Sequence, residues 1–243
     1  MTKIPKIPDE IFAGFCDDVK KAFGEQLVSV ILFGSAGRGE YIPRKSDINF
    51  LVVLEDNSPS VLVAFRKDLA RWRKRNVTTP LFLTEKYIQF SLDTFPLEFL
   101  EMQSAYKVLY GKDVLSGLRF EKSHLRTQAE RELKGKLLHL RQEFLESHGK
   151  VESLTALVSS SLAAFAPVFR GLLRLKGKEE TVKRIDLLQS VCGEFGLDGD
   201  LFALLFRIAR GETRCAASEM SGLFDRYVRE IDRLSQMVDT MEI

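Results

Sequence analysis

The spacing of apolar residues divides the chain into a first part with strands and a second part with helices alone. Continuous apolar runs at 27–33 and 49–54 predict strands that are buried on both faces. Apolar residues at helical spacing predict helices over 8–24 and 59–75. The other elements predicted in this part are strands at 80–83, 95–102 and 106–110, and one or two helical turns within 85–92.

After about residue 122 the pattern becomes helical throughout and shows no strand signal. The predicted helices cover 125–144, 154–169, 179–192, 199–209 and 220–238. Strands first and helices afterwards indicate two domains. The predicted fold class is therefore α+β with a mixed sheet over 1–115, followed by an all-α helical bundle over 116–243.

Composition narrows the classes of partner. The chain has 243 residues, 45% of them hydrophobic and 29% charged, which is typical of a soluble globular protein. Residues 1–113 carry 16 basic and 15 acidic side chains, and residues 114–243 carry 20 and 19. Such a balance argues against dedicated nucleic-acid binding. The basic run Arg71–Arg75 is typical of a solvated helix end, with nucleic-acid contact as the alternative.

We expect a cytoplasmic protein. The uncharged run 153–169 is short for a membrane span and is rich in hydroxyl residues, so we expect a buried bundle helix there and no membrane association. The first residues have no apolar core of the kind found in signal peptides. The cysteines, Cys16, Cys192 and Cys215, are odd in number and far apart, which fits a reducing compartment.

Residues 31–54 are the stretch in which the sequence proposes chemistry. The first apolar run ends at Gly34-Ser35, and a turn with further glycines follows, where backbone N–H groups, the Ser35 hydroxyl and Arg38 are candidate donors to an anion. Asp47 and Asn49 enter the next strand on the same face, about 6.6 to 6.8 Å apart along the chain. A bound phosphate next to carboxylates implies a hard cation between them, and magnesium is the ordinary choice.

This order of strand, Gly-Ser turn, Ser-Asp-x-Asn and second strand resembles the DNA polymerase β-like nucleotidyltransferase superfamily. The layout is closest to aminoglycoside nucleotidyltransferases and to uncharacterised bacterial nucleotidyltransferase-like proteins. The resemblance implies that the turn holds the triphosphate of ATP or another nucleoside triphosphate, with Gly34 and Ser35 as nucleotide-binding residues. Arg38 and Ser46 are our further candidates for nucleotide binding. It implies Mg²⁺ held by Asp47, Asn49 and a third residue on a nearby strand. Glu98 is our candidate for that residue, with Asp93 and Glu101 as alternatives, and Asp47 and Glu98 are the predicted catalytic pair.

Asn49 departs from the family pattern, which has a carboxylate at this position. An amide oxygen still coordinates a hard cation, but it adds no negative charge and accepts no proton. Two functions therefore stay open. One is transfer of a nucleoside monophosphate from Mg-bound nucleoside triphosphate to a hydroxyl of an unknown acceptor. The other is a catalytically inactive protein that binds a nucleotide or a partner.

A third, weaker hypothesis comes from Arg141 and His148, whose spacing resembles the Arg-His motif of small ribonuclease domains that accompany minimal nucleotidyltransferases. The ordinary interpretation is a solvated helix end. The expected partners are a nucleotide and a small-molecule or protein acceptor, and a homodimer is left open. Acidic residues are not concentrated in the second half, so charge does not favour a polycationic aminoglycoside as acceptor.

Overall fold

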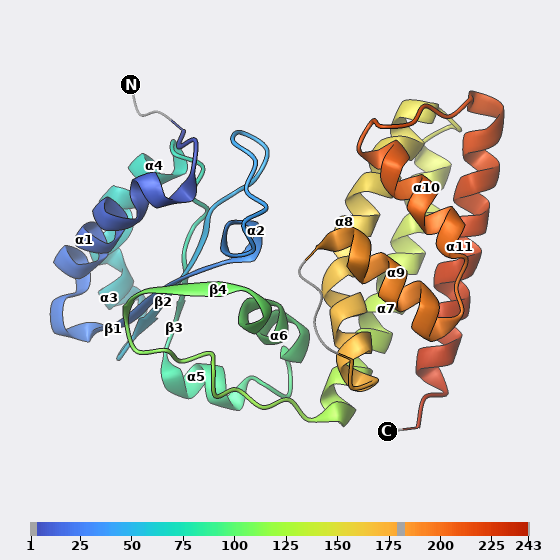
Figure 1. The fold of residues 1–243 in the computed structure, drawn as a ribbon. Coiled ribbons are helices and arrows are strands. Elements are labelled where there is room, and N and C mark those ends of the chain that lie inside the picture. The colour runs from blue at the N-terminus through green and yellow to red at the C-terminus, as the bar shows by residue number, and fades with distance from the viewer. Residues whose placement is uncertain (1–3, 179–182, 243) are drawn as a thin grey trace. The chain divides into compact units, whose positions relative to one another are not determined.

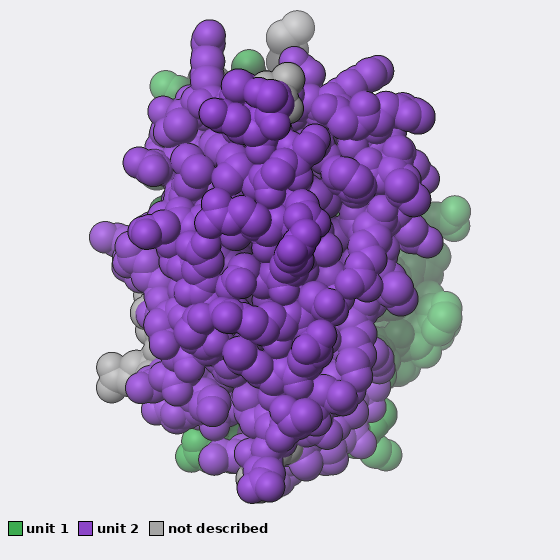
Figure 2. Space-filling view, turned by 90° about the vertical axis from the view of Figure 1, so that its right-hand side faces the viewer, with its two compact units in different colours: residues 1–92, 101–119 green, residues 93–100, 120–243 purple. Residues whose placement is uncertain are grey.

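The structure is a computed structural model that describes residues 4–178 and 183–242. The chain forms two compact units, shown in separate colours in Figure 2. Unit 1 comprises residues 1–92 and 101–119, and unit 2 comprises residues 93–100 and 120–243. A mixed sheet in the N-terminal part and helices in the C-terminal part confirm the predicted fold class (Figure 1).

Unit 1 is built on a four-stranded sheet with the order β3-β2-β1-β4. The central strand β1 pairs antiparallel with both β2 and β4, while β2 and β3 run parallel. Apolar side chains bury both faces of β1 and β2, as the continuous apolar runs predicted. The strands are β1 (Leu27–Phe33), β2 (Asn49–Leu54), β3 (Leu81–Leu83) and β4 (Tyr106–Gly111).

Helices of unit 1 cover the sheet through an aromatic core. Phe15 of α1 stacks on Phe50 of β2 with ring centroids 3.9 Å apart, and Trp72 of α4 meets Phe15 edge-on at 5.3 Å. The helix predicted over 59–75 is present as three consecutive short helices. The helical segments before residue 93 are η1 (Pro8–Ile11), α1 (Phe12–Phe23), η2 (Gly24–Gln26), α2 (Gly34–Gly37), α3 (Pro59–Leu62), η3 (Val63–Phe65), α4 (Arg66–Arg73) and α5 (Glu85–Phe90).

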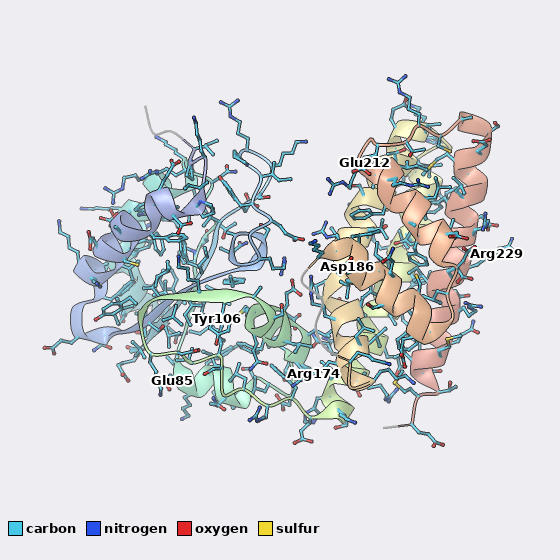
Figure 3. All side chains as sticks on the ribbon, viewed as in Figure 1. Glu85, Tyr106, Arg174, Asp186, Glu212 and Arg229 are labelled. Carbon is cyan, nitrogen blue, oxygen red and sulfur yellow. The ribbon has the colours of Figure 1, made fainter. Side chains whose placement is uncertain are left out.

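The edge of unit 1 near β4 is fixed by side chains labelled in Figure 3. Tyr106 opens β4 and donates its hydroxyl to Asp113 at 2.8 Å. Burial, together with this carboxylate, raises the pKa of the Tyr106 phenol above its ordinary value. Glu85 of α5 accepts a hydrogen bond from Lys112 at 2.5 Å. These contacts hold the chain after β4 against the rest of the unit.

The strand predicted over 95–102 is wrong, because this segment is the helix α6 (Pro96–Ser104). The strand was predicted from a short alternation of apolar and polar residues, Leu97, Glu98 and Phe99. The buried side chains of Leu97 and Leu100 lie one helical turn apart, and Pro96 occupies the first helical position, where its missing N–H costs nothing.

Unit 2 is a bundle whose core consists mainly of leucine, phenylalanine and valine side chains. Its helices confirm the predicted ones, except that the start of the helix predicted over 179–192 lies partly outside the described residues. They are α7 (Lys122–Glu146), α8 (Val151–Leu175), α9 (Arg184–Phe195), α10 (Gly199–Ala209) and α11 (Ala217–Asp239). By length and composition α8 could cross a membrane, but 61% of its most apolar window is buried inside the protein.

The first turns of α6 belong to unit 2. Leu97 and Leu100 are buried in the bundle core, and the Leu97 N–H donates to Gln128 Oε1 of α7 at 2.8 Å. The same amide group of Gln128 donates through Nε2 to Glu98 at 2.7 Å. A methyl group added at Gly171 of α8 would lie 2.3 Å from a Leu97 methyl, so an alanine there would require the Leu97 side chain to shift.

Candidate nucleotide-binding site

The glycine turn predicted at Gly34-Ser35 is a single helical turn, α2, that follows β1 directly. Gly34 has φ +74°, a conformation that glycine adopts at little cost. A Cβ atom at Gly34 would lie 3.0 Å from Asn49 Nδ2, so the turn rests on the Asn49 side chain. Glu40 N–H closes the turn by donating to Ser35 C=O at 2.9 Å. Gly34 and Asn49, which the sequence placed in one site, are therefore brought together.

The other side of the turn lies against the chain that enters β4. A Cβ atom at Gly37 would be 2.5 Å from the backbone oxygen of Ala105, closer than real Cβ atoms approach an oxygen. This contact needs a residue without a side chain. The turn therefore lies close to the Asn49 side chain through Gly34 and to the Ala105 backbone through Gly37.

Arg38, predicted to contact phosphate, is engaged by two carboxylates. Its Nη1 lies 2.5 Å from Glu101 Oε1 and its Nε lies 3.4 Å from Glu40 Oε2. Only 9% of the Arg38 side chain is exposed. The guanidinium thus ties the end of α2 to the last turn of α6, which favours a positioning role for Arg38. Glu101, one of the alternatives for the third carboxylate, is the partner in this ion pair.

Ser46 and Asp47 form the approach to β2. The Ser46 hydroxyl accepts a hydrogen bond from Ile42 N–H at 3.0 Å, which closes the loop before the strand. Asp47 is exposed and directly precedes the buried Ile48. Burial raises the pKa of the nearby Tyr41 phenol, and the negative charges of Glu10 and Asp47 raise it further. Asp47 thus presents a carboxylate at the start of β2.

Asn49 has a hydrogen-bond partner that no sequence pattern predicted. Its Oδ1 accepts a hydrogen bond from the Thr78 hydroxyl at 2.9 Å. Thr78 is placed there by backbone pairing, because Ile48 N–H donates to Asn76 C=O at 2.8 Å and Thr78 N–H donates to Ile48 C=O at 3.1 Å. No local pattern marks Thr78, since only the pairing of the segment 76–78, which precedes β3, with Ile48 brings it to this site. The residue beside Asn49 on the adjacent chain segment is therefore a neutral threonine.

Glu98 does not lie on a strand beside Asp47. It lies on α6, in the part of that helix assigned to unit 2, and accepts a hydrogen bond from Gln128. The strand predicted to carry it is wrong, whereas its catalytic role stays a prediction. Asp93, the other alternative, is exposed and accepts a hydrogen bond from the Thr94 hydroxyl at 3.0 Å.

The donor set at this sheet edge does not fit a magnesium ion held by the protein. Within residues 4–178 and 183–242, no group of three or more His, Cys, Asp or Glu side chains is arranged to hold a metal ion. At the start of β2 the available groups are the Asp47 carboxylate, the Asn49 amide and the Thr78 hydroxyl. Divalent cations are ordinarily held at protein sites by carboxylates, and of these three described groups only Asp47 supplies one.

Comparisons with known proteins bear on the same segment. The sequence model of the family described as nucleotidyltransferase domain matches residues 14–104, which include β1, α2, β2 and β3. No curated protein matches the chain in sequence. Among solved structures the chain is similar to the spectinomycin adenyltransferase AAD(9) from Enterococcus faecialis, crystallised with ATP and spectinomycin.

The likeness to this adenyltransferase extends over 96% of the present chain and 99% of the other, with a TM-score of 0.57 and 12% sequence identity. At so low an identity the comparison shows a shared fold, and function has to be argued from the site. Residues 14–104 are thus similar in sequence to a nucleotidyltransferase domain, and the chain shares its fold with an adenyltransferase.

Proposed function

We propose that the chain binds a nucleoside triphosphate at the sheet edge formed by α2 and the start of β2, and transfers the nucleoside monophosphate to a hydroxyl group of an acceptor. The observation that carries the proposal is the contact between Gly34 and Asn49, within the segment that matches a nucleotidyltransferase domain. This contact joins the proposed phosphate turn to the strand that presents Asp47.

Each predicted residue has a proposed role. Gly34 lets the backbone approach the triphosphate, and the Ser35 hydroxyl and backbone N–H groups donate to it. Ser46 fixes the loop that leads to Asp47. Arg38 positions the turn through Glu101 and Glu40. We retain Glu98 as the proposed general base for the acceptor hydroxyl.

The acceptor proposed is a small molecule or a protein. AAD(9), which shares the fold, was crystallised with a small-molecule ligand besides ATP. The charges of residues 114–243, 20 basic and 19 acidic, do not favour a polycationic acceptor. We further propose a cytoplasmic location.

The test is pyrophosphate release from ATP, GTP, CTP or UTP in the presence of candidate hydroxyl acceptors. We expect Asp47→Asn to lower the rate at least about 100-fold, because the variant loses the carboxylate at the start of β2 that would hold a divalent cation together with the bound triphosphate, and such a cation would stabilise the charge of the transferring group. Asp17→Asn, which removes an exposed carboxylate of α1 in the same unit, should leave the rate unchanged. Equal rates for the natural protein and Asp47→Asn would contradict the proposal.

A second candidate is a protein that binds the nucleotide without transferring it. The hydrogen-bonded pair of Asn49 and Thr78 supports it, since neither side chain carries a negative charge or accepts a proton. Calorimetry would show ATP binding, and no acceptor would release pyrophosphate. Creation of transfer by Asn49→Asp would favour this candidate, whereas measurable transfer by the natural protein would exclude it.

The ribonuclease hypothesis receives little support from the side chains it requires. Arg141 lies 3.5 Å from Asp232 in an ion pair, and His148 follows the end of α7 with φ +49°. RNA cleavage that depends on His148 would be required to revive it.

A further inference from the structure

The side chains of Asn49 and Thr78 form a neutral pair at the sheet edge where the proposed triphosphate site lies. The Thr78 hydroxyl donates to Asn49 Oδ1 at 2.9 Å and also lies 3.4 Å from Ile48 C=O. Asn49 Nδ2 faces Gly34 of the turn. Backbone pairing on both sides of Ile48 fixes this arrangement. The pair is therefore a built feature of the sheet edge.

The pair leaves one carboxylate at the start of β2. Asn49 and Thr78 are neutral at all ordinary pH values, so Asp47 supplies the negative charge there. Glu40 and Glu101, two acidic residues near the turn, form ion pairs with Arg38. A divalent cation in a protein site typically takes several anionic oxygens, or a carboxylate together with the phosphates of its substrate.

We infer that the nucleotide-free protein holds no divalent cation at this sheet edge, and that the Asn49–Thr78 pair is the reason. The inference rests on the proposed nucleotide site and deepens it. The ligand is a nucleoside triphosphate that binds through the turn, either alone or as its own complex with a cation. Affinity for the nucleotide consequently depends far less on magnesium than it would at a site with three carboxylates.

Thr78 matters as much as Asn49 in this inference. A carboxylate at position 49 alone would receive the hydrogen bond of the Thr78 hydroxyl and raise the number of carboxylates to two. A carboxylate at both positions places two anionic groups side by side on adjacent chain segments, next to Asp47. Asn49→Asp combined with Thr78→Asp should therefore create a cation site that neither substitution creates alone.

The adjacent residue offers a matched control. Thr79 is exposed, and its hydroxyl accepts a hydrogen bond from Arg73 at 2.9 Å, so its side chain serves a different contact from that of Thr78. The variants N49D/T78D and N49D/T79D have the same net charge. They differ in whether the second carboxylate lies beside residue 49.

The experiment titrates Mn²⁺ into nucleotide-free protein and follows free Mn²⁺ by electron paramagnetic resonance, with circular dichroism as the check of folding. We expect N49D/T78D to bind Mn²⁺ at least about tenfold more tightly than the natural protein and N49D/T79D, a factor that corresponds to about 1.4 kcal/mol. Equal affinities of the two double variants would overturn the inference.

Mn²⁺ titration of the nucleotide-free natural protein tests the inference even if N49D/T78D fails to fold. Mn²⁺ binding by the natural protein that is abolished by Asp47→Ala would overturn the inference, and absence of such binding would support it. Calorimetry of ATP with EDTA and with Mg²⁺ separates the two proposals. ATP that fails to bind under both conditions would contradict the proposed function, while the Mn²⁺ titration would still report on the cation site.

Discussion

Gly37 lies so close to the backbone oxygen of Ala105 that its missing side chain is a structural requirement. Alanine is ordinarily the better residue inside a helix, by about 1 kcal/mol. At position 37, however, the added methyl group would be 2.5 Å from backbone that has no rotamer to change. Steric overlap therefore outweighs helix propensity at this residue.

We predict that Gly37→Ala lowers the free energy of unfolding by about 1 to 3 kcal/mol, the usual cost of forcing an extra methyl group into a packed contact. Gly14→Ala in α1 is the control, because its methyl group would meet Trp72 at an ordinary 3.6 Å. Gly14→Ala should be neutral or stabilising. Urea unfolding followed by circular dichroism measures both, and equal effects would contradict the prediction.

At the scale of elements, the short helix α2 depends on its neighbours. It has four residues, too few to be stable by itself. Asn49, Ala105 and the ion pairs of Arg38 hold it from different sides. Arg38 is the cation that Glu40 and Glu101 share, and its side chain is largely buried. Removing it would therefore break both ion pairs in a place where water screens charge poorly.

We predict that Arg38→Ala destabilises the protein by about 1 to 3 kcal/mol, less than the cost of breaking a fully buried pair because Glu101 retains some exposure. The variant should also weaken ATP binding, since the turn loses its attachment to α6. Arg66→Ala, which removes an exposed arginine of α4, is the control. Chemical denaturation and calorimetry measure the two effects. ATP binding unchanged in a destabilised variant would show that Arg38 stabilises the fold without positioning the turn.

Elements with a long or uniform pattern were predictable from sequence, and those that depend on pairing were not. The apolar runs of β1 and β2 matched the observed strands, because both strands are buried on both faces. The α6 segment was misassigned because its alternation covers three residues, although Pro96 was a usable sign of a helix start. The loop that contains Gly34 and Asp47 was recognisable because a strand, a Gly-Ser turn, Ser-Asp-x-Asn and a second strand follow one another in the sequence. Thr78 was not, because no sequence signal states that the segment before β3 pairs with Ile48.

At the scale of the whole molecule, the boundary between units does not follow the chain. Residues 93–100 belong to the bundle, although residues 101–119 that follow them belong to unit 1. Leu97 and Leu100 are 3% and 1% exposed within the bundle core. A cut at residue 115 would therefore remove two core leucines from unit 2.

We predict that a fragment of residues 93–243 is more stable than one of residues 116–243 by at least about 2 kcal/mol, because burial of one leucine side chain contributes about that much. Thermal and urea unfolding of the two fragments measure the difference. Leu97→Ala with Leu100→Ala in the longer fragment should abolish it. Equal stability of both fragments would instead support the domain boundary at 115 that the sequence predicted.

The assignment of residues 93–100 to the bundle also sets the order in which the protein is completed during synthesis. These residues leave the ribosome before β4, yet the helices that bury them, α7 and α8, emerge later. The sheet is complete once β4 has paired with β1. At that stage the helices that bury the apolar side chains of α6 have not yet been synthesised. Since chains grow at about 5 to 20 residues per second, this exposure lasts for seconds. Over this interval Leu97 and Leu100 lack the bundle helices that bury them in the folded protein.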